Sequence, residues 1–265
     1  MKQTDSGEGR IHTELEDGVL LIAIDRAQKL NGFTPQMMRG MAKAYTDFEH
    51  DPAARCAVVH AEGKHFTAGL DLPKMAPYLG SDSLLVETGE IDPFDLGPPF
   101  RSKPVIFAVQ GICFTLGIEM MLAADIVIAS SDCRFSQLEV KRGLMPTGGA
   151  TIRMVERAGW GNAMRYLLTG DEFDAPTALR LGFVQEVVPP GQQLQRATEL
   201  ARHIAEQAPL AVRETICNAR TALFDGPTAA RTAFGKTQKE LLASEDFKEG
   251  LRSFREKREP KFSGR

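Results

Sequence analysis

Two glutamates are the first candidates for chemistry. Glu119 lies between Ile118 and Met120, and Glu139 follows it 20 residues later. A carboxylate in an apolar setting must be paired, hydrogen-bonded or functional. Two carboxylates that face one substrate can hold a water molecule and divide general-base and general-acid work, and their repulsion favours one protonated and one ionised form. A structural ion pair is the alternative for Glu119, and spacing alone does not prove that the two groups meet.

Two glycine-containing segments could supply hydrogen-bond donors for the same reaction. Residues 110–119, QGICFTLGIE, lead from an apolar run into a helix that we expect to begin at Leu116. The start of a helix offers unpaired N–H groups and a positive dipole end, which suit a ligand oxygen that gains negative charge. Residues 64–72, KHFTAGLDL, follow a strand expected at 56–60, and their glycine lets the backbone turn sharply and present free N–H groups. The alternative for this segment is a plain turn into a helix capped by Asp71.

The elements that must position these groups follow from the apolar periodicity. Short, nearly continuous apolar runs rich in β-branched residues predict buried strands at 19–24, 56–60, 105–109 and 126–129, with a brief strand at 183–188. Helical spacing begins at Pro35 and dominates after Pro146, and it predicts helices at 150–158, 162–169, 175–181, 193–207 and 210–223 and a charged, periodic tail from 232. Strands that alternate with helices indicate an α/β fold.

Between residues 75 and 103 the periodicity disappears. This segment holds several glycines, a proline group at 93–99 and many acidic residues. Long loops in compact domains are often lids or binding loops, so we expect the segment to be the most mobile part of the free protein. A tolerated insertion without a role is the alternative.

The composition excludes several classes of protein. The chain has 265 residues, 43% of them hydrophobic and 25% charged, as is ordinary for a globular domain. Its formal net charge of −3 disfavours a nucleic-acid partner. The four cysteines stand alone without metal-ligand spacing, and no apolar stretch is long enough to cross a membrane. We therefore expect a soluble, cytoplasmic protein without a metal.

In order and spacing, these segments resemble the enoyl-CoA hydratase/isomerase (crotonase) family. The A-G-x-D, G-x(5)-G-x-E, F-x-x-x-E and G-x-x-P segments of that family are matched by residues 68–71, 111–119, 135–139 and 143–146. The resemblance runs from about residue 11 to the end of the chain and includes residues 168–184 and the tail from 244.

The resemblance implies a fold and a set of site residues. Residues 11–190 form a crotonase-like spiral of β-β-α units, and residues 191–265 form a helical region that assembles a trimer or a dimer of trimers. The resemblance further implies that the backbone N–H groups of Leu70 and Leu116 form an oxyanion hole and that Glu119 and Glu139 are the catalytic residues. Further contacts to the acyl-CoA substrate are assigned to Ala68, Gly69, Asp71 and Gly117, and to Phe254 and Lys257 at the coenzyme A site of a neighbouring subunit.

Retention of both glutamates favours hydration of a 2-enoyl-CoA, an activity of fatty-acid metabolism, with coenzyme A as part of the substrate and no separate cofactor. A crotonase-fold isomerase, hydrolase or decarboxylase and a non-catalytic acyl-CoA-binding protein remain as alternatives. The sequence departs from the family at Leu116, where glycine is usual, at Phe114 and Thr115, which replace smaller residues, and at Thr147.

Overall fold

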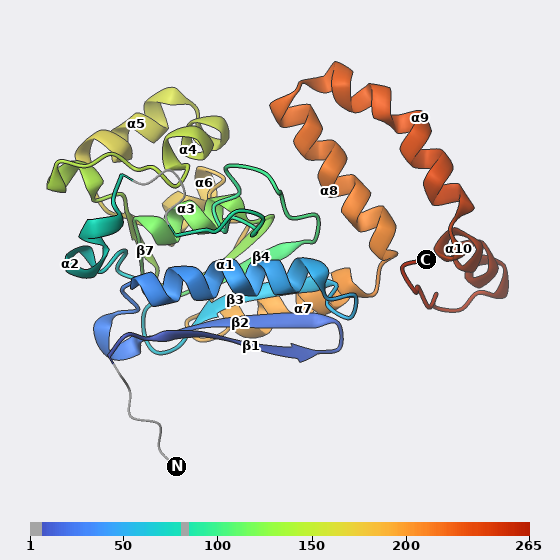
Figure 1. The fold of residues 1–265 in the computed structure, drawn as a ribbon, viewed down its shortest axis with the longest axis horizontal. Helices are drawn as coiled ribbons and strands as arrows, with labels where there is room; N and C mark the ends of the chain where they lie inside the picture. The colour runs from blue at the N-terminus through green and yellow to red at the C-terminus, as the bar shows by residue number, and fades with distance from the viewer. Residues whose placement is uncertain (1–6, 81–84) are drawn as a thin grey trace, which may run out of the picture.

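The computed structural model describes residues 7–80 and 85–265, and a mixed sheet forms its centre (Figure 1). The strand order is β1-β2-β3-β4-β6-β9, with β1 antiparallel to β2 and the other neighbours parallel. The bounds are Arg10–Glu16 for β1, Val19–Asp25 for β2, Cys56–Ala61 for β3, Val105–Val109 for β4, Ile126–Ser130 for β6 and Glu186–Val188 for β9. The four apolar runs predicted as strands are therefore strands, whereas only the end of the predicted 183–188 strand is extended.

Alternate residues of these strands enter two separate cores, which explains why the runs are apolar throughout. On one face, side chains such as Ile22 and Val59 pack with helix α1 (Pro35–His50) in the larger core. On the other face, Val58 and Ile106 pack against the alanines of helix α7 (Gln193–Ala205). The sheet is thus covered on both faces, as Figure 1 shows.

A second, smaller sheet makes the fold a spiral. It has the order β5-β7-β8, with β5 at Ile112–Phe114, β7 at Arg134–Ser136 and β8 at Phe173–Asp174. The chain passes from β4 of the first sheet to β5 of the second and then into helix α3 (Leu116–Ala123), and it repeats this course from β6 to β7. The strands of the second sheet have two or three residues, too few for a periodicity that sequence analysis could detect.

The remaining helices surround this framework. They are α2 (Leu72–Met75), α4 (Ala150–Ala158), α5 (Trp160–Thr169) and α6 (Ala175–Arg180), with 3-10 turns η1 (Ala27–Lys29), η2 (Ala76–Tyr78) and η3 (Glu139–Arg142). Asp174 caps α6 by accepting a hydrogen bond from the Thr177 N–H at 2.9 Å, as its type and position predicted.

The last 57 residues form an arm that extends from the body of the molecule (Figure 1). It consists of α8 (Pro209–Phe224), α9 (Pro227–Ala243), α10 (Glu245–Glu256) and the tail. Arg55 ties the arm back to the body by donating to the carbonyl oxygens of Ala205 and Phe262. Helix α7 packs on the sheet, so the body of the molecule includes α7 and the arm begins at α8. The division at residue 190 that the resemblance implies stays a prediction.

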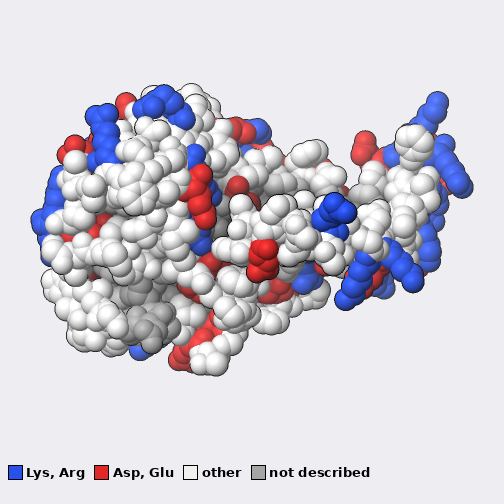
Figure 2. Space-filling view, turned by 90° about the horizontal axis from the view of Figure 1, so that it is seen from above, with Lys and Arg blue, Asp and Glu red and all other residues white. Residues whose placement is uncertain are grey.

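The surface of the arm is both apolar and basic. Figure 2 shows Lys and Arg side chains gathered at its free end, where α10 and the tail lie. Large apolar side chains are exposed along its helices, namely Leu223, Phe224, Phe234, Leu242, Phe247, Leu251 and Phe254.

The segment from 75 to 103 has no helix or strand after η2 among its described residues, as its sequence predicted; residues 81–84 lie outside the described part. Two of its apolar side chains, Ile91 and Phe94, are nevertheless buried in the larger core. None of the helices in the described part of the chain is both long enough and apolar enough to cross a membrane. Of the cysteines, Cys56, Cys113 and Cys133 are buried free thiols, as the apolar runs around the first two predicted.

Candidate active site

The two segments that could supply N–H donors lie side by side. Thr67 forms an isolated bridge with Cys113, in which the Thr67 N–H donates to the Ile112 carbonyl at 3.0 Å and the Phe114 N–H donates to the Thr67 carbonyl at 3.0 Å. The turn that follows β3 is thereby aligned with the start of α3, although about 45 residues separate the two segments in sequence.

Two backbone N–H groups at this junction have no acceptor within the described residues. One belongs to Leu116, the first residue of α3, and the other to Leu70, which follows Gly69 at a φ of +107°. Both residues line one cavity. Two free donors, one of them at the positive end of a helix dipole, can stabilise an oxygen that develops negative charge. The leucine side chain of residue 116 leaves its N–H free.

A buried polar network holds the turn that carries Leu70. The Thr67 hydroxyl accepts from the Gly69 N–H at 3.1 Å and donates to the Asn31 carbonyl at 2.7 Å. The Asn31 amide in turn donates to the carbonyls of Glu62 and His65. Because these groups satisfy one another, the turn is fixed before any ligand binds.

Glu119 enters the cavity from the first turn of α3. It is only 5% exposed, and its Oε1 accepts hydrogen bonds from the N–H groups of Gly148 at 2.7 Å and Ala150 at 3.2 Å. Burial and, to a smaller extent, the charge of Glu139 raise the pKa of Glu119 to about 7, against the opposing effect of the two backbone hydrogen bonds. A Cβ at Gly148 would lie 2.7 Å from the Glu119 Oε2, so the close approach requires glycine.

Glu139 faces the same cavity from the start of η3. It is half-buried, and burial raises its pKa to about 6. In the orientation that satisfies both ends of its amide, Gln137 donates to the two carboxylate oxygens of Glu139 at 3.2 and 3.0 Å. An amide can also accept a hydrogen bond from a protonated acid, so Gln137 can hold Glu139 in either ionisation state.

These groups share a cavity of about 890 Å³. Its wall also includes the segment 86–98 and the loop before α4, and the apolar side chains in it are Leu70, Leu79, Val86, Phe94, Leu96, Leu116, Leu144 and Met145. The described lining contains five carboxylates, those of Glu87, Glu90, Asp92, Glu119 and Glu139, and no Lys, Arg or His. The cavity therefore combines an apolar wall, an acid–base pair and free donors for an oxyanion, which suits proton transfer at carbon atoms next to a carbonyl group.

The geometry and the sequence comparison agree on the family. The sequence pattern described as enoyl-CoA hydratase/isomerase matches residues 14–265 of the chain. The chain belongs to this family.

Individual relatives are similar over nearly the full length. An enoyl-CoA hydratase of Mycobacterium tuberculosis is 32% identical over 276 aligned positions that cover all of both proteins. A carnitinyl-CoA dehydratase of Proteus mirabilis is 34% identical, with 96% of this chain and 98% of the relative covered. The crystal structure of a probable enoyl-CoA hydratase/isomerase from Mycobacterium abscessus superposes with a TM-score of 0.93 at 44% identity, covering 96% of this chain and 98% of that one. The fold is therefore that of crotonase.

The other residues that the resemblance assigned to the substrate lie around the turn rather than in the cavity wall. The Ala68 N–H donates to the Leu30 carbonyl at 2.9 Å, and the Asp71 carboxylate pairs with Arg26 at 2.8 Å. A Cβ at Gly117 would lie 2.5 Å from the Thr67 methyl group, so this glycine allows α3 to pack against the turn. The contacts seen for Asp71 and Gly117 fix the donor-bearing segments. A direct contact with substrate stays a prediction for Ala68, Gly69, Asp71 and Gly117.

Phe254 and Lys257 lie in and at the end of α10, on the arm that extends away from α3 and the two sheets (Figure 1). Phe254 is 84% exposed, and Lys257 ends α10 with a φ of +54°. Neither residue lines the cavity of its own chain. Their assigned role requires a neighbouring subunit and stays a prediction.

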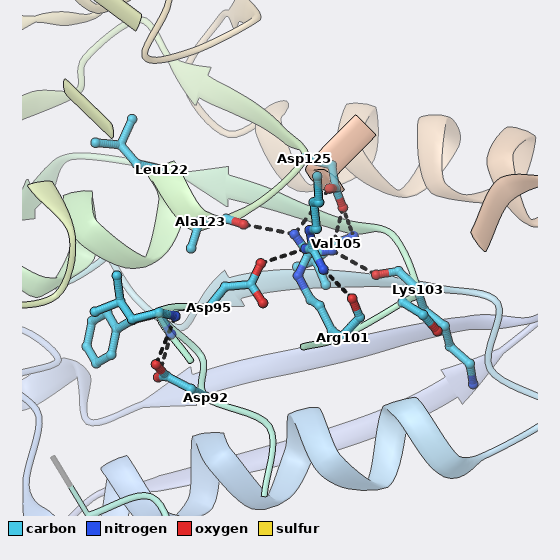
Figure 3. Close-up of polar contacts among 12 residues, drawn as sticks. Asp92, Asp95, Arg101, Lys103, Val105, Leu122, Ala123 and Asp125 are labelled. Atoms are coloured by element: carbon cyan, nitrogen blue, oxygen red, sulfur yellow. Dashed lines mark hydrogen bonds and ion pairs between the residues drawn. The ribbon is translucent and has the colours of Figure 1, made fainter. Parts of the chain in front are cut away.

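A charge cluster around the buried Arg101 joins helix α3 to strand β4 (Figure 3). Arg101 pairs with Asp125 at 2.6 Å and donates to the carbonyls of Ala123, at the end of α3, and Lys103. The Val105 N–H donates to Asp125 at 2.7 Å, so the pair fastens the helix that carries Glu119 to β4.

The same cluster reaches the cavity wall and the arm. Asp95 belongs to the segment 86–98, and its carboxylate pairs with Arg220 of α8 at 2.6 Å. Arg220 also donates to the Arg101 carbonyl, and Arg153 of α4 donates to the Asp95 carbonyl at 2.9 Å. The position of the cavity wall is thus coupled to helix α8 of the arm.

Sequence analysis did not identify Gln137 or the N–H groups of Gly148 and Ala150 as parts of the site. Gln137 lies two residues before Glu139, and a fully buried amide beside a carboxylate has no signature in sequence spacing. The two N–H groups belong to Gly148 and to Ala150, the first residue of α4, and glycines before a helix are a general signal for an anion-binding helix start.

Proposed function

We propose that this protein is a 2-enoyl-CoA hydratase, which adds water across the C2=C3 double bond of a 2-enoyl-CoA thioester. The observation that carries the proposal is a single cavity in which two carboxylates with raised pKa values face two free backbone N–H groups. A family isomerase typically relies on one glutamate, so the second carboxylate favours hydration. Relatives named carnitinyl-CoA dehydratase fit this proposal, because dehydration is the reverse reaction.

In the proposed reaction, the thioester oxygen accepts hydrogen bonds from the Leu70 and Leu116 N–H groups. These donors stabilise the enolate-like charge that develops when water attacks C3. Removal of one oxyanion donor typically lowers kcat by about 10²–10³.

Glu119 and Glu139 divide the proton transfers. Glu119 takes a proton from the attacking water as its oxygen bonds to C3, and Glu139 delivers a proton to C2. The product gains one water molecule in total, while the proton has moved from Glu139 to Glu119. Proton exchange between the carboxyl groups or with solvent restores the pair.

The pKa values support a pair that holds about one proton near neutral pH. With values of about 7 and about 6, both groups are protonated in acid and both are ionised in base. The N–H groups of Gly148 and Ala150 stabilise negative charge on the Glu119 Oε1, but the pKa of Glu119 remains above that of Glu139, so the shared proton lies mainly on Glu119 in the free protein. In the proposed reaction this proton passes to Glu139 before Glu119 activates water.

No metal or redox cofactor takes part in the proposed reaction, and coenzyme A enters with the substrate. We further propose that the exposed apolar side chains of the arm pack against other copies to form a trimer or a dimer of trimers. We place the enzyme in the cytoplasm, where buried free thiols such as Cys56 and Cys113 remain reduced.

The absorbance of the conjugated enoyl thioester tests the proposal. Loss of absorbance with a 2-enoyl-CoA is the expected result. A gain with a 3-enoyl-CoA and no loss with the 2-enoyl-CoA would identify an isomerase instead. Binding without any change in absorbance would identify an acyl-CoA-binding protein.

A further inference from the structure

Thr115 occupies an unusual backbone conformation at the centre of the site. It connects β5 to α3 with a φ of +50° and a ψ of −116°, a region that β-branched residues rarely adopt. The Thr115 N–H donates to the Ser136 carbonyl at 2.9 Å, and the Thr115 carbonyl accepts from Ile118 at 2.9 Å and Glu119 at 3.2 Å. The surrounding backbone therefore imposes a conformation that glycine would adopt without strain.

The Thr115 hydroxyl is not used as a helix cap. A threonine that precedes a helix commonly accepts a hydrogen bond from the second or third N–H of the helix, but Thr115 makes no such bond. No described residue forms a hydrogen bond with its hydroxyl, and the residue lines the cavity together with Leu70, Leu116 and Glu119. The hydroxyl is thus available to a ligand.

The hydroxyl lies between the two segments that carry the free donors. A Cβ built on Gly69 would be 2.2 Å from the Thr115 Oγ1, so this oxygen fills the space above the turn. Gly69 directly precedes Leu70, and Thr115 directly precedes Leu116. The hydroxyl therefore lies next to both free N–H groups, since each of them belongs to the residue that follows Gly69 or Thr115.

We propose that the Thr115 hydroxyl is a third hydrogen-bond donor to the thioester oxygen of the bound acyl-CoA. This inference rests on the proposed function, because it assigns the thioester oxygen to the Leu70 and Leu116 N–H groups. A hydroxyl can donate one hydrogen bond and rotates to suit its acceptor. Side-chain donors act in oxyanion holes alongside backbone N–H groups, and their bonds strengthen as the oxygen gains charge. Loss of the Thr115 hydroxyl should therefore lower kcat more than it changes KM.

Three substitutions separate the hydroxyl from the strain and the shape of the side chain. Thr115→Val keeps the branched shape without the donor, Thr115→Ser keeps the donor, and Thr115→Gly removes the donor and the strain together. Thr13→Val, on the exposed strand β1, is the matched control. We expect Thr115→Val and Thr115→Gly to lower kcat for a 2-enoyl-CoA by about 10²-fold with little change in KM, and Thr115→Ser to stay within a few-fold of the wild type. Full activity of Thr115→Gly, or equal losses for Ser and Val, would overturn the proposal.

A second readout does not depend on turnover. Butanoyl-CoA labelled with ¹³C at its carbonyl is saturated and cannot be hydrated, and each hydrogen bond to the carbonyl lowers its infrared stretching frequency. We expect the bound band of Thr115→Val and Thr115→Gly to lie at higher frequency than that of the wild type and of Thr115→Ser. An unchanged band would refute the third donor even if kcat fell. A shifted band in a protein that hydrates no enoyl-CoA would support the donor and reject only the hydratase proposal. If Thr115→Val fails to fold, the Gly and Ser variants decide the question, because glycine fits this backbone without strain.

Discussion

Replacing Glu119 with glutamine should remove activity and, above neutral pH, increase stability. Glutamine keeps the size of the side chain and an oxygen that accepts from the Gly148 and Ala150 N–H groups, but it cannot take a proton from water. General acid–base groups typically contribute about 10²–10⁴ to the rate. We therefore expect kcat to fall by at least about 10², while binding of the thioester persists.

The gain in stability follows from the direction of the pKa shift. Burial and the charge of Glu139 raise the pKa of Glu119 from 4.5 to about 7, so the folded protein binds this proton more tightly than the unfolded chain does. The resulting stabilisation is complete below pH 4.5 and is lost as the pH rises through about 7. The difference corresponds to at most about 3 kcal/mol in the free energy of unfolding. Relative to the wild type, Glu119→Gln should gain up to this amount at pH 8.5 and much less near pH 4.5.

Urea unfolding at pH 4.5 and pH 8.5 measures the change in stability, and initial hydration rates measure the change in activity. Glu156→Gln, on the exposed side of α4, is the control. The double variant of Glu119 and Glu139 should lose less activity than the product of the single losses, because both groups act on one water. A structural ion pair at Glu119 would instead give a variant that is less stable at pH 8.5 and retains its rate. Wild-type hydration rates in both Glu119→Gln and Glu139→Gln would refute the assignment of the catalytic pair.

Four further predictions follow from the site and its supports. Gly69→Val should abolish most activity, because the φ of Gly69 is +107° and a Cβ there would strike the Thr115 hydroxyl. Leu70→Ala should lower activity only mildly. If steady-state kinetics showed a full rate for Gly69→Val, the oxyanion hole would be misplaced. Asp125→Asn should lower the free energy of unfolding by about 1.5–3 kcal/mol, because it replaces the carboxylate that pairs with the buried Arg101 by a neutral amide. Glu172→Gln, in an exposed pair with Arg134, should change it by less than about 1 kcal/mol, and equal effects in denaturant titrations would contradict this reasoning. An enoyl-CoA whose acyl chain ends in a carboxylate should have a much lower kcat/KM than its methyl-ended analogue. The described cavity wall holds carboxylates such as Glu87 and Glu90 and no basic side chain, so it would repel the added negative charge. Equal kcat/KM values would argue against this cavity as the acyl site. Light scattering should detect a trimer or hexamer at micromolar concentration, and a monomer would rule out assembly through the arm.

The sequence by itself determined the local elements and the family. Continuous apolar runs specify strands that are buried on both faces, and Pro35 and Asp174 mark helix starts through backbone restrictions that act within a few residues. The ordered motifs around residues 68–71, 111–119 and 135–139 were sufficient to indicate the crotonase fold, because each motif encodes a local requirement for a turn or a helix start.

Only the tertiary structure decided which of these groups meet. The raised pKa of Glu119 depends on burial and on Glu139, and the Thr115 hydroxyl reaches Gly69 only because the bridge between Thr67 and Cys113 aligns two distant segments. The assignment of α7 to the body likewise depends on its alanines packing against alternate residues of the sheet. Contacts of this kind join residues far apart in the chain, and since no local preference encodes them, periodicity and spacing could not reveal them.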